Sequence, residues 1–98
     1  MPQPIVDAEM IRKEDIPSLV FNKEEVLQSL EQMNHRMSNL QRGMRGGNAN
    51  KHKVNVYFFD ASGKEYRVET TIWAVTAQRV VFKHGTTVPV CRVSHVSL

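Results

Sequence analysis

The sequence contains a single cysteine, no long apolar run and few aromatic residues. Cys91 has no second cysteine to pair with, which excludes an internal disulfide. No apolar stretch approaches the ~20 residues that a membrane-spanning helix requires. The N-terminus, MPQPIVDAEMIRKEDIPSLVF, carries acids where a secretory signal would carry cations. These absences favour a cytoplasmic protein with no membrane partner.

Patterns typical of catalytic, metal-binding or phosphate-binding sites are also missing. A zinc site needs clustered ligands, whereas the histidines are widely spaced and have no cysteine pair nearby: His35, His52, His84 and His95. Cys91 stands among valines, which is typical of a buried, inert thiol. The segment RGMRGG lacks the Gly-Lys-Ser/Thr ending of a phosphate loop. We therefore expect no enzyme activity, cofactor, metal or small-molecule substrate.

Positive charge is concentrated in the middle of the chain. The 98 residues have a net charge of +3. Residues 1–25 contain six acids and three bases, whereas residues 26–53 contain one acid and five bases. Residues 54–98 contain three acids and five bases. This uneven distribution indicates a polyanionic partner.

The first half of the chain predicts an arm, a helix and a linker. Three prolines interrupt residues 1–20, which predicts a flexible arm. Asn22 and Glu25 have the spacing of a helix N-cap and its reciprocal partner, so we expect an amphipathic helix over residues 21–44. The glycines of GMRGG indicate that the helix ends near Arg42. Residues 45–53 then form a basic linker rich in Gly and Asn.

The predicted helix has an apolar seam with spacings of four and three residues: Val26, Leu30, Met33, Met37, Leu40 and Met44. A lone helix of about twenty residues is marginal in water and needs a partner surface. The seam can lie across the open end of the chain's own barrel. It can also pair with a second copy as a coiled coil.

Beyond the linker the apolar period changes to two, which predicts strands over residues 54–98. In KVNVYFFD, alternate residues are apolar, and the ASGK that follows is a turn with Gly63 available for a positive φ. EYRVETTIWAVTA, QRVVFK and VPVCRVSHVSL supply the remaining strands, with Pro89 confined to an edge or bend. We expect an α+β fold: an N-terminal helix plus a small, strongly bent antiparallel sheet or barrel of Sm-like or SH3-like type.

Two stretches resemble the Sm-like fold, and most nearly the bacterial Hfq-type RNA chaperones. VNVYFFDASGKEYRVETTIWAV is similar to the first Sm signature, and RVVFKHGTTVPVCRVSHV to the third strand, short turn and final strand pair. The resemblance covers about residues 22–97. It implies a helix followed by five bent strands, assembly into a homo-oligomer and RNA binding. The chain has Pro89-Val90-Cys91 where the Hfq pore carries Tyr-Lys-His, so that motif is not carried over.

Two functions fit these features. The first is an RNA-binding regulator that acts as a homo-oligomer, with phosphates contacted by the basic segment and the barrel rim: Arg36, Arg42, Arg45, Lys51, Lys53, Arg79, Lys83 and Arg92. The second is an oligomerisation or protein-interaction module without nucleic-acid binding, whose interface is Val26, Leu30, Met33, Met37 and Leu40. Tyr57, Phe59 and Trp73 offer a stacking platform if exposed, but in so small a barrel they are more often core or interface.

Overall fold

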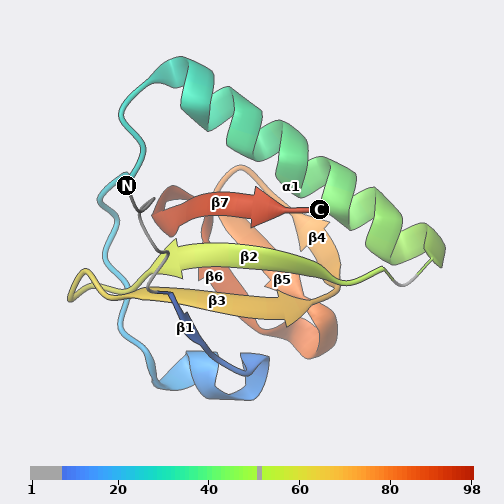
Figure 1. Ribbon diagram of the computed structural model, residues 1–98, viewed down its shortest axis with the longest axis horizontal. Coiled ribbons are helices and arrows are strands. Elements are labelled where there is room, and N and C mark those ends of the chain that lie inside the picture. Colours follow the sequence, from blue (N-terminus) through green and yellow to red (C-terminus); the bar gives the residue numbers. More distant parts are fainter. Residues whose placement is uncertain (1–7, 51) are drawn as a thin grey trace, which may run out of the picture.

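The computed structural model describes residues 8–50 and 52–98, and its fold is α+β, as the sequence predicts. One long helix lies against two small sheets with the strand orders β1-β3-β2-β7 and β4-β5-β6 (Figure 1). The strands are β1 (Glu9–Met10), β2 (Val54–Phe59), β3 (Glu65–Thr70), β4 (Ile72–Val75), β5 (Arg79–Phe82), β6 (Thr87–Pro89) and β7 (Val93–Ser97). The helix is α1 (Leu30–Asn50), and three 3-10 helices are η1 (Lys13–Ser18), η2 (Lys83–Gly85) and η3 (Val90–Arg92).

The two sheets are joined by a bend at Thr71, the single residue between β3 and β4. β3 pairs antiparallel with β2, whereas β4 pairs antiparallel with β5. No glycine stands at the bend, and both Thr70 and Thr71 are buried. β3 and β4 are therefore two halves of one bent strand that passes from the first sheet to the second.

The predicted period of two in the strands is confirmed by their burial. Every second residue of β2 is buried, and β3 alternates in the same way. The apolar core consists of Ile16, Leu40, Val54, Val56, Phe58, Tyr66, Val68, Ile72, Val80, Phe82, Val88, Val90, Val93 and Val96. The predicted turn is also present, with Gly63 at a φ of 89°.

The helix begins later than the sequence predicts. Instead of Asn22, its N-cap is Ser29, whose hydroxyl accepts a hydrogen bond from the Gln32 amide at 3.1 Å. The Gln32 side chain in turn accepts from the amides of Gln28 and Ser29, which completes a capping box. Glu25 accepts from the Leu27 amide at 2.9 Å and so stabilises a local turn outside the helix.

The helix also continues through the glycines that were expected to end it. Gly43 and Gly47 lie one turn apart on its buried face. A Cβ atom on Gly47 would lie 2.7 Å from both the Ile72 carbonyl oxygen and the Thr71 Cγ2, and one on Gly43 would lie 3.1 Å from Ile72 Cδ1. The missing side chains allow α1 to approach β4 closely, and this packing compensates for the poor helix propensity of glycine. In the described part of the chain no helix is long and apolar enough to cross a membrane.

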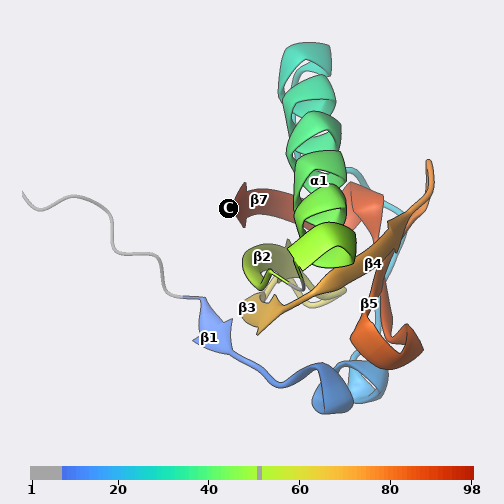
Figure 2. The ribbon, with the colours of Figure 1, turned by 90° about the vertical axis from the view of Figure 1, so that its right-hand side faces the viewer.

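The predicted apolar seam is only partly correct. Leu40 is fully buried in the chain's own core, and Met37 and Met44 pack against that core. Val26 precedes the helix, while Leu30 is 72% exposed because the first turns of α1 project beyond the sheets (Figure 2). The buried stripe of the helix instead runs through Arg36, Leu40, Gly43 and Gly47. The helix thus packs on its own barrel, and Leu40 is unavailable to a second copy.

The chain before the helix is docked on the barrel rather than flexible from residue 8 onward; residues 1–7 lie outside the described residues. β1 pairs in parallel with β3, and the Ile11 amide donates to the Arg67 carbonyl at 2.9 Å. η1 then places Ile16 in the core, where it is 1% exposed. Residues 8–18, called the N-terminal arm below, are therefore docked on the rest of the fold.

The close approach of α1 to β4 predicts opposite effects of alanine at two neighbouring glycines. Gly47→Ala should lower the free energy of unfolding by about 1–3 kcal/mol, because its Cβ meets backbone. Gly46→Ala is the matched control: its Cβ would lie 3.6 Å from His52 Cβ, an ordinary contact. It should raise the free energy by about 0.5–1 kcal/mol through helix propensity. Urea unfolding measures both, and equal effects at the two sites would contradict the packing.

Candidate nucleic-acid interface

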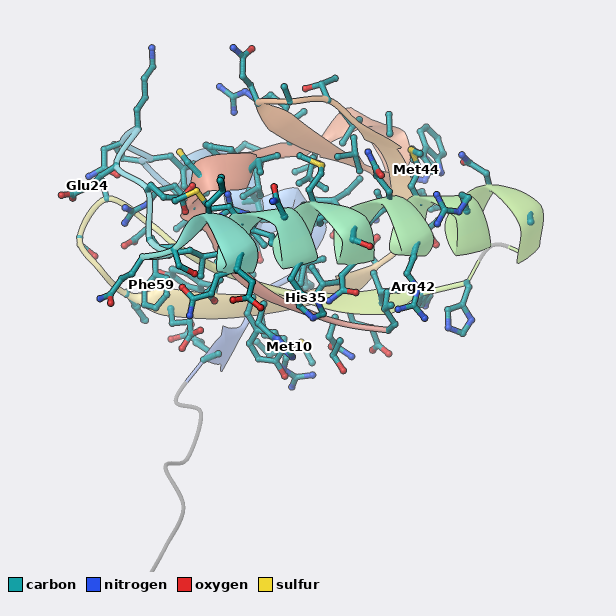
Figure 3. All side chains as sticks on the ribbon, turned by 90° about the horizontal axis from the view of Figure 1, so that it is seen from above. Met10, Glu24, His35, Arg42, Met44 and Phe59 are labelled. Atoms are coloured by element: carbon teal, nitrogen blue, oxygen red, sulfur yellow. The ribbon has the colours of Figure 1, made fainter. Side chains whose placement is uncertain are left out.

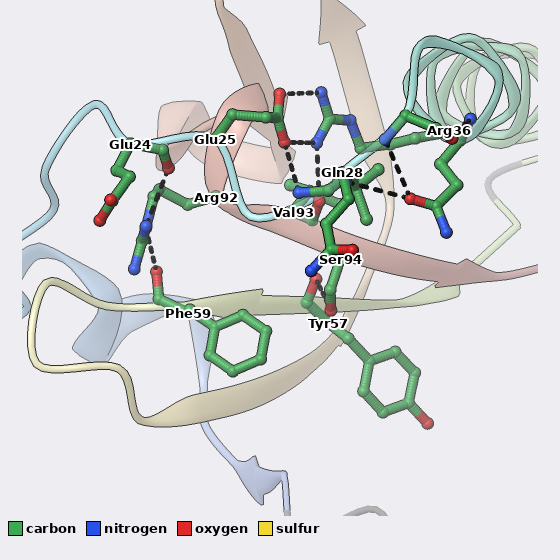
Figure 4. A network of polar contacts seen from close by, with 12 residues as sticks. Glu24, Glu25, Gln28, Arg36, Tyr57, Phe59, Arg92, Val93 and Ser94 are labelled. Atoms are coloured by element: carbon green, nitrogen blue, oxygen red, sulfur yellow. Dashed lines mark hydrogen bonds and ion pairs between the residues drawn. The ribbon is translucent and has the colours of Figure 1, made fainter.

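Two of the arginines expected to contact phosphates are structural. Arg36 is buried and pairs bidentately with Glu25, with N–O distances of 2.6 and 2.8 Å (Figure 4). It also donates to the Val93 carbonyl at 3.0 Å. Its Nε is buried and has no partner among the described residues. A guanidinium held in this way cannot reach a phosphate, so the prediction for Arg36 is wrong.

Arg92 is likewise withdrawn from the surface. It lies in η3, where it is 5% exposed, rather than on the rim of a strand. Its guanidinium donates to three backbone carbonyls, those of Glu24, Phe59 and Asp60, at 2.8, 3.3 and 2.7 Å. Arg92 therefore ties the segment before the helix to the β2–β3 turn, and its prediction as a phosphate contact is wrong.

The remaining predicted cations fall into separate groups. Arg42 is exposed on the side of α1 that also carries His35, away from Met44 (Figure 3). Arg79 is exposed in another groove, which Lys23 also lines. Lys51 lies outside the described residues. Arg45 is exposed on α1, three residues before Asn48, whereas Lys53 and Lys83 line one cleft with that asparagine.

This Trp73 cleft has a volume of about 310 Å³ and is lined by Gly47, Asn48, Lys53, Thr71, Trp73 and Lys83. Lys53 and Lys83, 30 positions apart in the sequence, meet here because Lys53 follows α1 and Lys83 begins η2. The Lys83 amide donates to the Thr71 carbonyl at 3.0 Å, which fixes η2 beside the bend. Among residues 8–50 and 52–98, no carboxylate lines this cleft.

Trp73 follows the buried Ile72 in β4 and therefore faces outward, and it lies at a β-bulge. In the β4–β5 pairing, Ile72 faces Phe82 and Ala74 faces Val81, so Trp73 has no partner residue. Bulges redirect side chains and are common beside functional sites. Trp73 is 46% exposed in the single chain, so of the two expected positions, core or subunit interface, the core position is wrong. Tyr57 and Phe59 are half-buried on the outer side of β2.

The His84 ring packs against Trp73 edge-on, with the ring centroids 5.6 Å apart. His84 adopts a φ of 69°, a strained conformation for a residue with a side chain, and Gly85 follows at 94°. This left-handed pair turns the chain between β5 and β6 and places the imidazole beside the indole. The HGTT turn was predicted, but nothing in the sequence indicated its contact with Trp73.

A second hollow continues from the Trp73 cleft. This arm hollow has a volume of about 270 Å³ and shares Lys53, Thr71 and Lys83 with the cleft. Its other lining residues are Met10, Ile11, Arg12, Lys13 and Glu14 from the N-terminal arm, and Glu69 and Thr70 from β3. The two hollows thus form one groove, with the two lysines at the shared boundary.

The other candidate residues do not assemble into a chemical site. Among residues 8–50 and 52–98, no three His, Cys, Asp or Glu side chains are grouped to hold a metal ion. Cys91 is a free, half-buried thiol in the groove with Lys23 and Arg79, rather than fully buried as expected. His35 and His95 line a groove of about 330 Å³ between α1 and β7. His95 stacks obliquely on Tyr57 there, with centroids 5.4 Å apart.

The chain matches no protein-family model, and no curated protein or solved structure is similar to it.

The Glu25–Arg36 pair predicts acid sensitivity. Burial raises the pKa of Glu25, but the hydrogen bonds from Arg36 and from the Leu27 amide outweigh it and hold the pKa below its usual value of 4.5. A carboxylate with a lowered folded pKa stabilises the fold above about pH 4.5 and loses that contribution as the pH falls through its folded pKa. Glu25→Gln should flatten this acid limb. Urea unfolding between pH 7 and pH 3 measures it, and an unchanged slope in the variant would contradict the assignment.

Proposed function

We propose that the protein binds RNA and acts as a regulatory RNA-binding protein, with the Trp73 cleft as the contact surface. The observation that carries this proposal is the meeting of an exposed indole with two lysines in a cleft that no carboxylate of the described residues lines. Aromatic rings provide stacking surfaces for unpaired bases, and lysines neutralise phosphates. The exposed Arg45 lies on α1 three residues before Asn48, which lines the cleft.

The order of the elements supports an Sm-like relationship within this proposal. β3 and β4 count as one bent strand, so α1 is followed by five strands, which is the order that the resemblance implies. The proposal does not use the buried arginines. It places RNA instead on the corner where the bent strand passes between the sheets.

Self-association through the helix seam has less support. Leu40, the last residue of the predicted interface, is fully buried in the chain's own core. The first turns of α1 remain, with Leu30 exposed. We therefore base the proposed function on a single chain. Comparing the solution mass of the Leu30→Lys variant with that of the parent decides whether this exposed turn joins two copies.

Trp73 is the only tryptophan, so its fluorescence reports directly on the cleft. Adding a single-stranded oligouridylate of about eight nucleotides should quench the emission, because a base stacks on the indole. Trp73→Ala should weaken binding, measured by anisotropy of labelled RNA, by the ~1–3 kcal/mol that one stacked base contributes. Binding of equal strength in the variant would remove Trp73 from the proposal.

Replacing both cleft lysines tests the phosphate contacts. Lys53→Ala/Lys83→Ala should reduce the salt dependence of log K by about 1.4, since each contact to a single strand contributes about 0.7. The charge-matched control is Lys23→Ala/Arg79→Ala in the separate groove, which should keep most of the parent's affinity. No RNA binding by the parent at low salt would refute the proposed function. Equal losses of RNA affinity in both double variants would show that binding does not depend specifically on the Trp73 cleft.

A further inference from the structure

The N-terminal arm forms one wall of the groove that begins at Trp73. Five consecutive arm residues, 10–14, line the arm hollow opposite β3 and the bend. The arm is positioned there by the β1–β3 pairing and by Ile16, which is anchored in the core. The far half of the groove therefore exists only while the arm is docked.

The arm hollow can bind one more phosphate, in addition to those contacted by Lys53 and Lys83. Arg12 is exposed and Lys13 is largely covered, with side-chain exposures of 76% and 18%. Their carboxylate partners are local: Arg12 contacts Asp15 at 3.2 Å, and Lys13 contacts Glu14 at 2.7 Å. An exposed pair of this kind contributes little stability, so Arg12 can exchange its carboxylate for a phosphate at small free-energy cost.

Glu69 also lines the arm hollow, and its negatively charged side chain cannot pair with a phosphate. A carboxylate can accept a hydrogen bond from a ribose 2′-hydroxyl, the group that distinguishes RNA from DNA. The arm hollow thus combines cations with two exposed acids, Glu14 and Glu69, and Glu14 is already paired with Lys13. This mixture fits a ribose-phosphate backbone better than a partner that carries only negative charge.

We infer that a bound RNA strand continues from the Trp73 cleft, across Lys53 and Lys83, into the arm hollow, where Arg12 takes a further phosphate. This inference rests on the proposed function. The inference makes the N-terminal arm part of the binding site and couples RNA binding to docking of the arm. A strand long enough to occupy both hollows keeps the arm docked, whereas a dinucleotide occupies the Trp73 cleft alone.

Limited trypsin digestion of the unmodified protein tests this coupling, because trypsin cleaves after Arg12 and Lys13. An oligouridylate of about eight nucleotides should slow cleavage at these two bonds severalfold and quench Trp73. A uridine dinucleotide at a concentration that quenches Trp73 equally should leave the cleavage rate unchanged. An oligodeoxyuridylate of the same length should protect less than the ribo-oligomer if Glu69 accepts from the 2′-hydroxyl.

A charge variant provides the second readout. Arg12→Gln/Lys13→Gln should reduce the salt slope for the longer strand by up to about 1.4 and leave dinucleotide binding unchanged. Circular dichroism and urea unfolding confirm that the variant is folded, and Lys23→Ala/Arg79→Ala serves again as the charge-matched control. Quenching of Trp73 without protection of the arm would overturn the inference while leaving RNA binding intact. Absence of quenching by any strand would instead refute the proposed function.

Discussion

The ion pair between the buried Arg36 and the half-buried Glu25 is the constraint on which the position of the helix depends. Arg36 lies in the first half of α1 and Glu25 in the segment before the helix, so the pair fixes where the chain turns into the helix. Its bond to the Val93 carbonyl attaches the helix to β7 at the same point. Placing a guanidinium away from water requires good geometry and partners for its protons. The two carboxylate bonds and the carbonyl provide most of them, while Nε remains unpartnered.

From this fixed point the helix runs toward the bend between the sheets, where its glycines determine how closely it packs. Gly43 and Gly47 bring the backbone of α1 against Ile72, and Gly47 with Asn48 then forms a wall of the Trp73 cleft. A helix with ordinary side chains at these positions would be held farther from β4. The cleft is thus a consequence of backbone packing, and its basic side chains come from segments on either side of that contact.

The sequence predicted the parts of the fold that depend on local patterns. Alternation in β2 and β3, the turn at Gly63 and the α+β class follow from side-chain period and turn chemistry. The predicted start of the helix was wrong because the sequence contains two capping patterns. Ser29 and Gln32 form the capping box, whereas the Glu25 carboxylate binds Arg36 instead. The helix passes the glycines because tertiary contact overrides propensity. The same limit applies to the site. Burial of Arg36 and Arg92 depends on carbonyls from distant segments, which no charge count reveals. The bulge at Trp73 likewise depends on how β4 pairs with β5.

The bulge at Trp73 also makes the site separable from the fold. On either side of it the ladder is regular, with Ile72 opposite Phe82 and Ala74 opposite Val81. Loss of this one residue would close the ladder into continuous pairing and leave every neighbouring partner unchanged. Gain or loss of an aromatic contact surface in this architecture thus requires the insertion or deletion of only one residue.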